Sequence, residues 1–357
     1  MGGSDKVMTK LDDSKYIKSL DVSGMLETVE KSASQIVEVL KMDYQISLER
    51  RPENIILSGM GGSGIAVNFI SEIFSSSLDI PIYVNKGYSV PDWVDDKTLF
   101  IGTSYSGDTE ETLSSIKEAE NRGAKIILVS SGGAVQEIAI AKNYQFVNIK
   151  TGLQPRAAFY SIFSTLLLVF QKIGLASNVR NDLEEGIKVI GKLRDEIGVN
   201  RSTKSNIAKE IAGKLLNTFP VIFTATGITE SIGLRFKNQL NENSKVAGFL
   251  SVFPELNHNE IASFSRLQKG RDRFSLVIFR DDLENPRVSK RIETTKSIIG
   301  GGFLPTIEIK SEGVSRIAKA FSMVYMGDMV SVYLGILNNV DPSDVDIIYK
   351  FKKELAR

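Results

Sequence analysis

The chain has 357 residues, which is long for one hydrophobic core and predicts two domains of roughly 150 residues each. Its 44 basic and 43 acidic residues give a net charge of +1 without a long run of either sign, which disfavours nucleic acid and anionic membranes as main partners. The absence of cysteine and the single histidine exclude disulfides and thiol catalysis and nearly exclude a zinc site of the usual ligands.

No apolar run approaches membrane-spanning length and no signal peptide opens the chain, so we expect a cytoplasmic protein. The lack of cysteine agrees with the cytosol and also with life at high temperature. Because Met8 can be the natural start, the residues before it are left out of the fold prediction.

In the first half of the chain, short apolar strands alternate with helical stretches. Apolar spacing predicts a helix within residues 21–50, a second from about Ile65 to Phe74, and a third over 110–120. Strands are predicted at Asn54–Ser58, Ile80–Val84, Thr98–Thr103, Lys125–Val129 and Gln145–Ile149. This alternation predicts a parallel sheet covered on both faces, with an apolar helix over Arg156–Ile173 beneath it.

A charged helical connector over Asn178–Asn200 precedes a second series of the same kind. Its predicted elements are strands at Phe219–Thr224, Phe274–Phe279 and Pro305–Ile309, a hydroxyl-rich turn at Thr226–Ser231, and helices at Leu234–Glu242 and about Val314–Leu337. The second half therefore resembles a diverged copy of the first, on the scale of a whole domain. We expect an N-terminal domain over 8–177, a connector over 178–202 and a C-terminal domain over 203–357.

The segment Ile101–Glu110 predicts a strand, a hydroxyl-rich turn and a helix N-terminus. Such a turn offers backbone N–H groups and hydroxyls to an anion, and the helix dipole favours negative charge there. The turn lacks the lysine of a nucleotide-binding P-loop, so a monoester phosphate fits better than a triphosphate. An ordinary helix cap, with Asp108 at the N-cap and Glu111 closing a capping box, is the alternative.

A second turn, Gly59–Gly64, follows the first predicted strand and matches the dinucleotide pattern G-x-G-x-x-G. The strand at Ile80–Val84 leads into Asn-Lys-Gly and offers no acidic residue for a ribose, so a sugar or phosphate contact is favoured over a dinucleotide. Ligands bind beyond the carboxyl ends of the strands in open parallel sheets. We therefore expect four hydroxyls to converge on one phosphate, those of Ser63, Ser104, Ser106 and Thr109.

Acid–base candidates lie in the second half. One helix places four polar residues on one face at i, i+3, i+4 and i+7, namely Arg235, Asn238, Gln239 and Glu242. A solvated helix surface is the alternative for this face. His258 is the only histidine. A lone histidine is more often structural than catalytic, but the neighbours Asn257 and Asn259 are typical of a polar pocket, so both roles stay open.

Arg156 follows Pro155 at the start of a predicted helix and is a further candidate for a site. A helix-end or interdomain ion pair is its alternative. The basic residues at the end of the chain are typical of a solvated helix end.

Taken together, these residues resemble the archaeal-type bifunctional phosphoglucose/phosphomannose isomerases, which are built from two sugar isomerase (SIS) domains. Six segments carry the resemblance in chain order: Gly59–Gly64, Ser104–Thr109, Pro155–Ala157, Lys237–Glu242, Pro254–Glu260, and Val340–Pro342 with Ile348–Lys352. The Ser-Tyr-Ser-Gly-Asp-Thr turn is common to SIS domains, whereas the Asn-Glu and Asn-His-Asn-Glu segments are specific to this family.

The resemblance implies an α/β fold of two SIS domains, each a mostly parallel sheet flanked by helices in an αβα sandwich. It implies an aldose–ketose isomerase that interconverts glucose 6-phosphate and mannose 6-phosphate with fructose 6-phosphate through a cis-enediol. It also implies a homodimer that acts on a hexose 6-phosphate without a cofactor or a metal.

The same resemblance assigns roles to residues of this chain. The hydroxyls of Ser63, Ser104, Ser106 and Thr109 would bind the phosphate, and the backbone of Gly61 and Gly62 would contact the substrate. Glu242 would shuttle the proton between C1 and C2, and Arg156 would stabilise the enediolate.

Two further roles concern ring opening. His258 would help open the sugar ring, and it is similar to a residue that the family donates across a dimer interface. Lys352 matches the family's C-terminal lysine near the ring oxygen. Lys350 is the alternative, because the tail departs from the family pattern at Tyr349-Lys350-Phe351.

Two other functions are weighed against this one. Another SIS-type sugar isomerase, such as the sugar-converting half of an amidotransferase, is disfavoured because no glutaminase domain is attached. A non-catalytic sugar-phosphate sensor is disfavoured because the chain has no helix-turn-helix or basic arm for DNA.

Overall fold

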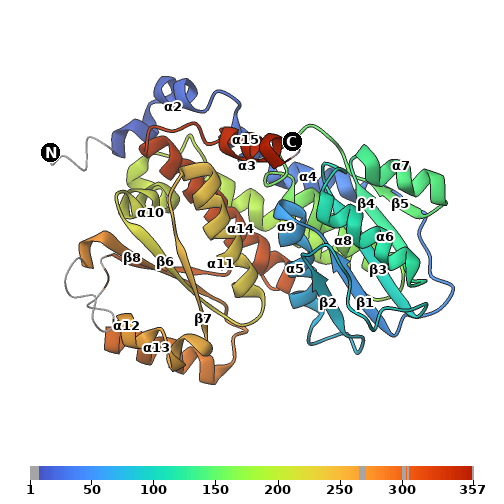
Figure 1. The fold of residues 1–357 in the computed structure, drawn as a ribbon. Helices are drawn as coiled ribbons and strands as arrows, with labels where there is room; N and C mark the ends of the chain where they lie inside the picture. The colour runs from blue at the N-terminus through green and yellow to red at the C-terminus, as the bar shows by residue number, and fades with distance from the viewer. Residues whose placement is uncertain (1–7, 265–270, 300–302, 304, 356–357) are drawn as a thin grey trace. The chain divides into compact units, whose positions relative to one another are not determined.

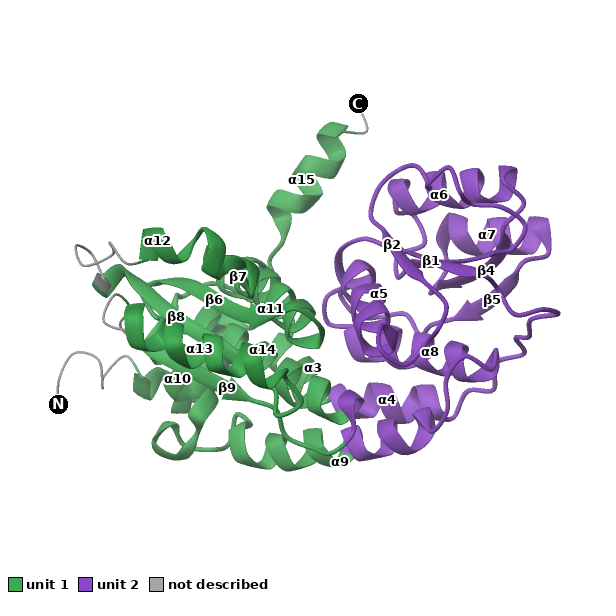
Figure 2. Cartoon of the chain, turned by 90° about the horizontal axis from the view of Figure 1, so that it is seen from below, with its two compact units in different colours: residues 1–31, 188–314, 318–357 green, residues 32–187, 315–317 purple. Residues whose placement is uncertain are grey.

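The computed structural model describes residues 8–264, 271–299, 303 and 305–355. The chain forms two compact units, which Figure 2 draws in different colours. Unit 1 comprises residues 1–31, 188–314 and 318–357, and unit 2 comprises residues 32–187 and 315–317. Each unit contains one parallel sheet, and the two are described in turn.

Unit 2 holds a five-stranded parallel sheet in the order β2-β1-β3-β4-β5. Its strands are β1 (Asn54–Ser58), β2 (Ile82–Asn85), β3 (Thr98–Ser104), β4 (Lys125–Ser130) and β5 (Gln145–Asn148). Every residue of the central strand β3 is buried, as expected for a parallel sheet covered on both faces. The predicted parallel sheet is thus confirmed.

Helices cover both faces of this sheet, as Figures 1 and 2 show. They are α4 (Ser32–Leu40), α5 (Gly61–Phe74), α6 (Glu110–Asn121), α7 (Gly133–Lys142) and α8 (Phe159–Lys172). Ile116 of α6 and Val135 of α7 pack with Phe100 in one core cluster. On the other face, Phe69 of α5 packs edge-on against Phe159 of α8, with ring centroids 4.9 Å apart.

Unit 1 holds a four-stranded parallel sheet in the order β7-β6-β8-β9. Its strands are β6 (Phe219–Ala225), β7 (Phe249–Phe253), β8 (Phe274–Arg280) and β9 (Thr306–Lys310). This order repeats β2-β1-β3-β4 of unit 2, which supports a copy on the scale of a whole domain. Strand β7 was not predicted from the sequence; it is a short edge strand whose first residue is exposed and whose burial is only partial.

The main helices assigned wholly to unit 1 are α2 (Ser14–Leu20), α3 (Met25–Glu30), α10 (Ile207–Leu215), α11 (Ile228–Gln239), α13 (Pro286–Ile299) and α15 (Asp346–Leu355). The chain passes between the units within α9 (Val179–Ile197) and α14 (Arg316–Leu337). Helices α5 and α11 begin earlier than predicted, at Gly61 and Ile228, because the turns themselves form the first helical residues.

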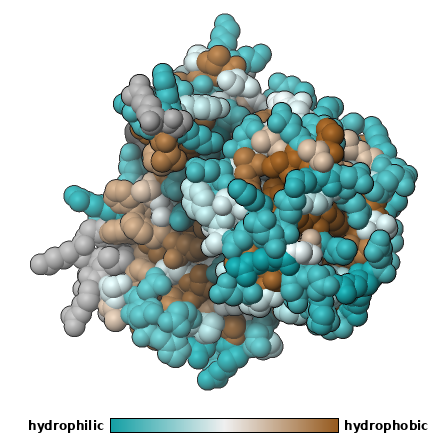
Figure 3. All heavy atoms as spheres, turned by 45° about the vertical axis from the view of Figure 1, so that its right-hand side comes forward, coloured by the Kyte–Doolittle hydropathy of each residue, from teal (hydrophilic) through white to brown (hydrophobic). Residues whose placement is uncertain are grey.

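Helix α14 corrects one expectation, that no apolar run approaches membrane-spanning length. It has 22 residues and is long and apolar enough to cross a membrane by length and composition. However, 94% of its most apolar window is buried inside the protein, which is equally typical of a core helix. On the face drawn in Figure 3, hydrophilic residues cover most of the surface and hydrophobic residues form separate patches.

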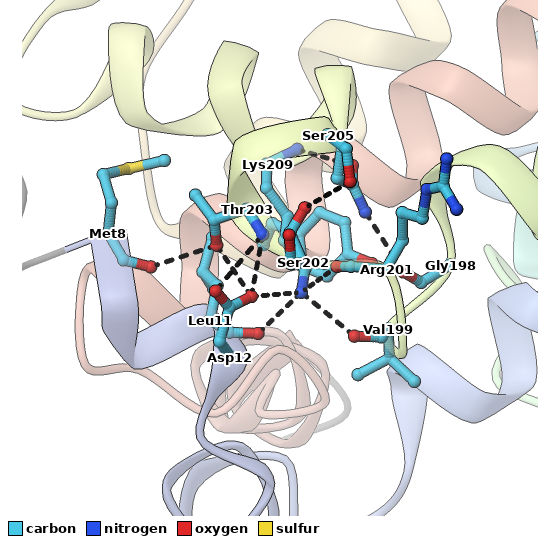
Figure 4. Close-up of polar contacts among 12 residues, drawn as sticks. Met8, Leu11, Asp12, Gly198, Val199, Arg201, Ser202, Thr203, Ser205 and Lys209 are labelled. Atoms are coloured by element: carbon cyan, nitrogen blue, oxygen red, sulfur yellow. Dashed lines mark hydrogen bonds and ion pairs between the residues drawn. The ribbon is translucent and has the colours of Figure 1, made fainter.

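A fully buried lysine anchors the start of the chain within unit 1 (Figure 4). Lys209 of α10 has no exposed side-chain surface, and its Nζ donates to the carbonyl oxygens of Leu11 at 2.8 Å, Val199 at 3.0 Å and Arg201 at 2.8 Å. The same Nζ lies 3.0 Å from Asp12 Oδ1. Burial raises the pKa of Asp12, but hydrogen bonds from Lys209 and Thr203 outweigh it, and the pKa ends below its ordinary value.

We expect Lys209→Met to lower the free energy of unfolding by at least about 3 kcal/mol, because it removes the donor to several buried oxygens. Lys214→Met on the same helix is the control, since Lys214 forms an exposed pair with Glu210 and its loss should cost less than about 1 kcal/mol. Calorimetric melting of both variants checks this. Equal melting temperatures for the two would contradict the anchoring role.

Candidate active site

In unit 2, the glycine-rich turn at Gly59–Gly64 and the hydroxyl-rich turn at Ser104–Thr109 meet at the carboxyl ends of neighbouring strands. Ser63 follows β1, and its Oγ accepts a hydrogen bond of 3.0 Å from the backbone amide of Tyr105, which follows β3. Ser63 and Ser104 are 3% and 1% exposed, so both hydroxyls are fixed inside the protein. The structure therefore brings together the two turns that the sequence places after separate strands.

The turn at Ser104–Thr109 is held in shape by its own hydroxyls. Ser104 Oγ lies 2.9 Å from Thr109 Oγ1 and accepts from the Gly107 amide at 3.1 Å, while Ser106 is exposed. Gly107 has φ +82°, and a Cβ there would lie 1.8 Å from the carbonyl oxygen of Gly132. Only glycine fits at this position, so the shape of the turn depends on Gly107.

The turn is not the ordinary helix cap that was considered as an alternative. The N-cap of α6 is Thr109 rather than Asp108, and among the described residues no side chain caps the helix by a hydrogen bond. Asp108 instead accepts from the amide of Ala134 at 3.0 Å, at the start of α7. The first turn of α6 thus keeps amide groups that a bound anion can use.

Arg156 lies beside the first of these turns. A Cβ on Gly62 would come within 2.4 Å of the Pro155 carbonyl oxygen and 3.2 Å of the Arg156 amide nitrogen. The start of α5 therefore packs directly on the Pro155–Arg156 backbone, a close approach that requires glycine. Arg156 itself is 5% exposed.

In unit 1, Glu242 lies in a single π-helical turn, Leu240–Ser244, that continues α11. Such turns occur often at functional sites. Its neighbours bind α14: Asn243 Nδ2 donates to Ser331 Oγ at 2.9 Å, and Ser244 Oγ donates to the Ser331 carbonyl oxygen at 2.6 Å. The turn is therefore fixed against the core helix while Glu242 remains partly exposed.

The polar face of α11 is not a solvated surface, which corrects that alternative. Arg235 and Asp328 of α14 form an ion pair of 2.7 Å and are 3% and 2% exposed. Gln239 Nε2 donates to the other oxygen of Asp328 at 2.9 Å. Two of the four residues on this face thus attach α11 to α14, and the other two, Asn238 and Glu242, stay partly exposed.

His258 ends a short 3₁₀ turn, Glu255–His258, just beyond the carboxyl end of β7. Its side chain is exposed, and its neighbour Asn257 is held by a hydrogen bond of 2.8 Å to Thr295 Oγ1. The turn that carries Glu242 precedes the amino end of the same strand. Since β7 has five residues, the two groups lie at opposite ends of a strand ~16 Å long.

Lys352 and Lys350 both lie on α15, with exposed side chains. The base of this helix is tied to the turn that carries Glu242 by Lys245, whose Nζ donates to the carbonyl oxygens of Glu242 at 2.6 Å, Asp341 at 3.0 Å and Asp344 at 2.7 Å. The apolar side chains of α15 are also exposed, among them Phe351 at 64%. An exposed apolar helix face of this kind is typical of a surface that another protein chain or segment covers.

The sequence analysis missed three residues of this arrangement. Tyr105 stands inside the hydroxyl-rich motif, between the two serines that were singled out. Asp328 is the only acidic residue in the 22-residue apolar helix α14, a signal that could have revealed a buried ion pair. Lys245 offers no comparable sequence signal, because it is one of many exposed lysines.

Comparison with known proteins places both units in one class. The SIS domain model matches residues 49–170, and the model described as the bacterial phospho-glucose isomerase C-terminal SIS domain matches residues 204–355. A bifunctional phosphoglucose/phosphomannose isomerase of Caldicellulosiruptor bescii is 38% identical over 93% of this chain and 99% of its own length.

The chain is also similar to a protein with a different named reaction and to a solved structure of low sequence identity. A D-glucosamine-6-phosphate 4-epimerase of Sulfolobus acidocaldarius is 32% identical over 90% of this chain and 97% of its own length. The crystallised C-terminal domain of glucosamine-fructose-6-phosphate aminotransferase from Francisella tularensis superposes with a TM-score of 0.67 at 13% identity, covering 90% of this chain and 98% of that one. At that identity the likeness concerns the fold alone.

We expect Asp328→Asn to lower the free energy of unfolding by about 3–5 kcal/mol, because the buried guanidinium of Arg235 loses its counter-charge. The double variant Arg235→Met/Asp328→Leu should recover most of that loss, since it leaves no buried charge. Glu27→Gln, which removes an exposed pair with Lys31, is the control and should not measurably change melting. A double variant no more stable than Asp328→Asn would contradict this explanation.

Proposed function

Because the chain belongs to the family of bifunctional phosphoglucose/phosphomannose isomerases, we propose that it interconverts glucose 6-phosphate and mannose 6-phosphate with fructose 6-phosphate. The observation that carries the proposal is the bond that joins the Gly59–Gly64 and Ser104–Thr109 turns at the ends of β1 and β3, with the Arg156 backbone packed against Gly62. A phosphate site and a cation beside it suit a charged sugar phosphate.

Ser63, Ser104, Ser106 and Thr109 bind the phosphate in this proposal, with the backbone of Gly61 and Gly62 against the substrate. The bonds among Ser63, Tyr105, Ser104 and Thr109 support it, because they fix the hydroxyls before any ligand arrives. Pre-ordered contacts to the non-reacting end can position C1 and C2 for reaction.

Glu242 is the proposed base. An aldose–ketose isomerase removes a weakly acidic proton next to a carbonyl and returns it to the adjacent carbon. One carboxylate can perform both transfers through a cis-enediol, so the chemistry needs neither a redox cofactor nor a metal. Glucose and mannose 6-phosphates differ only at C2 and give the same enediol, so a site tolerant at C2 processes both. Arg156 supplies the positive charge that the enediolate oxygen needs.

We infer that the enzyme is a homodimer in which His258 serves the site of the partner subunit. Glu242 and His258 of one chain lie beyond opposite ends of β7, a strand ~16 Å long, whereas the reacting carbons and the ring oxygen of a hexose lie within a few ångströms of each other. Lys352, with Lys350 as the alternative, would act at the ring oxygen once α15 is covered. Lys245 supports this role because it joins the base of α15 to the Glu242 turn.

A cytoplasmic location belongs to the same proposal, as do domains over 8–177 and 203–357 with a connector over 178–202. The compact units divide the chain differently, because residues 8–31 belong to unit 1 and the change of unit within α9 falls after Ile187. A sugar-phosphate sensor and another SIS-type isomerase remain the alternatives. The 32% identical relative is named an epimerase, which adds an alternative substrate class, an amino-sugar phosphate.

The test is conversion of fructose 6-phosphate by the purified protein in EDTA, with glucose 6-phosphate and mannose 6-phosphate followed separately. Both products are expected. Glucose 6-phosphate alone would restrict the function to an isomerase with a stricter C2 pocket. Saturable binding without turnover would favour a sensor, and turnover of D-glucosamine 6-phosphate alone would favour the epimerase reaction.

Hybrid dimers test Glu242 and His258 together. We expect Glu242→Gln to cut turnover at least ~10²-fold, the usual scale of acid–base catalysis, and His258→Asn to slow ring-closed substrate most. A purified hybrid of one subunit of each kind should recover about half of the turnover of the wild-type dimer, because one of its two sites then holds both groups. A hybrid as slow as its parents would place His258 and Glu242 of one chain in the same site.

A further inference from the structure

Tyr105 lies between two of the proposed phosphate-binding serines and has no part in the chemistry described above. Its side chain is 6% exposed. The hydroxyl donates to the carbonyl oxygen of Lys150 at 3.0 Å and accepts from the amide of Leu153 at 3.1 Å. Its backbone amide separately donates to Ser63 Oγ. One residue thus contacts both phosphate turns and a third segment.

That third segment is the irregular connection between β5 and α8, residues 149–158, which carries Arg156. Its two ends are held by backbone bonds, from the Ile149 amide to the Ser130 carbonyl oxygen at 2.8 Å and from the Ala157 amide to the Gln154 carbonyl oxygen at 2.8 Å, and Gln35 Nε2 donates to the Ala157 carbonyl oxygen at 2.9 Å. Between these ends, the Tyr105 hydroxyl bonds Lys150 and Leu153, and Pro155 packs on Gly62. Arg156 follows directly after these two attachments.

The Tyr105 hydroxyl suits this role because it uses both of its hydrogen-bonding capacities. Burial raises the pKa of Tyr105, so the group stays protonated at any physiological pH and can donate and accept at once. A phenylalanine at this position would keep the ring and the backbone amide. It would lose only the two bonds to the Arg156 segment.

We propose that Tyr105 is a positioning residue that sets the place of Arg156 relative to the phosphate turns. The inference rests on the proposed isomerase function, in which Arg156 stabilises the enediolate. The proposal predicts that phosphate binding and turnover respond differently to the loss of the hydroxyl, whereas a general loss of stability would weaken both. Phosphate binding depends on the Tyr105 backbone, whereas the placement of Arg156 depends on its hydroxyl.

The test is Tyr105→Phe in the full chain, with Tyr44→Phe as the matched control. Tyr44 is a buried tyrosine of the same unit whose hydroxyl bonds Thr165 at 3.3 Å, away from the turns. We expect kcat for fructose 6-phosphate to fall roughly 10- to 100-fold in Tyr105→Phe, since small misplacements of catalytic groups cost that much, while KM and the Kd for inorganic phosphate change less than about 3-fold. The control should keep its kcat.

A double-mutant cycle identifies the group through which Tyr105 acts. In an Arg156→Ala background, Tyr105→Phe should lower kcat by less than about 3-fold, because the group to be positioned is already gone. The full decrease in that background would overturn the proposal, as would an unchanged kcat in Tyr105→Phe alone. Loss of phosphate binding in step with kcat would also overturn it.

Hydrogen exchange at the Leu153 amide separates this proposal from the proposed function. The amide donates to the Tyr105 hydroxyl, so its protection should fall in Tyr105→Phe whether or not the protein turns over substrate. If the wild-type protein lacks isomerase turnover, the proposed function fails, and unchanged protection would then remove the positioning contact as well. With an active wild type, unchanged kcat refutes the positioning role alone.

Discussion

The hydrogen bond from the Tyr105 amide to Ser63 Oγ is the constraint on which the rest of the first site depends. It joins two turns that leave neighbouring strands, and it does so inside the protein, where an unpaired hydroxyl would be costly. The helix after β1 also packs on Pro155, and the missing side chain of Gly62 allows that approach. Ser63 and the Arg156 backbone are thus attached to the same first turn of α5 by a few local contacts.

Unit 1 repeats the strand order of unit 2 but uses its turns differently. After β6, the hydroxyl of Thr229 bonds the carbonyl of Ala225 at 2.9 Å, and that of Thr226 bonds the carbonyl of Phe253 at 3.0 Å. These hydroxyls stabilise the turn itself. The chemistry proposed for this unit belongs instead to Glu242 beyond the end of α11, where α14 fixes the backbone through Asp328 and Ser331. In the proposed function, one architecture thus serves phosphate binding in one unit and acid–base chemistry in the other.

Much of this arrangement could be predicted from the sequence. The strand at Asn54–Ser58 and the turn at Ser104–Thr109 are local patterns of apolar and hydroxyl residues, and both were identified. The apolar sequence around Asp328 could have indicated a buried ion pair, but not that Arg235 is the partner, because the two residues lie 93 positions apart in the chain. The role of Tyr105 depends in the same way on Leu153, which is 48 residues away. The edge strand β7 was not predicted, because its partial burial gives no clear apolar pattern in the sequence.

The most direct test of the central claim is a crystal structure of the protein with 6-phosphogluconate, an open-chain acid that carries its phosphate at the end opposite to the carboxylate. The account predicts phosphate oxygens within hydrogen-bond distance of Ser63, Ser104, Ser106 and Thr109. It predicts the carboxylate end beside Arg156 and Glu242 of one chain and His258 of the other subunit. A phosphate bound elsewhere, or a carboxylate end remote from Glu242, would contradict it.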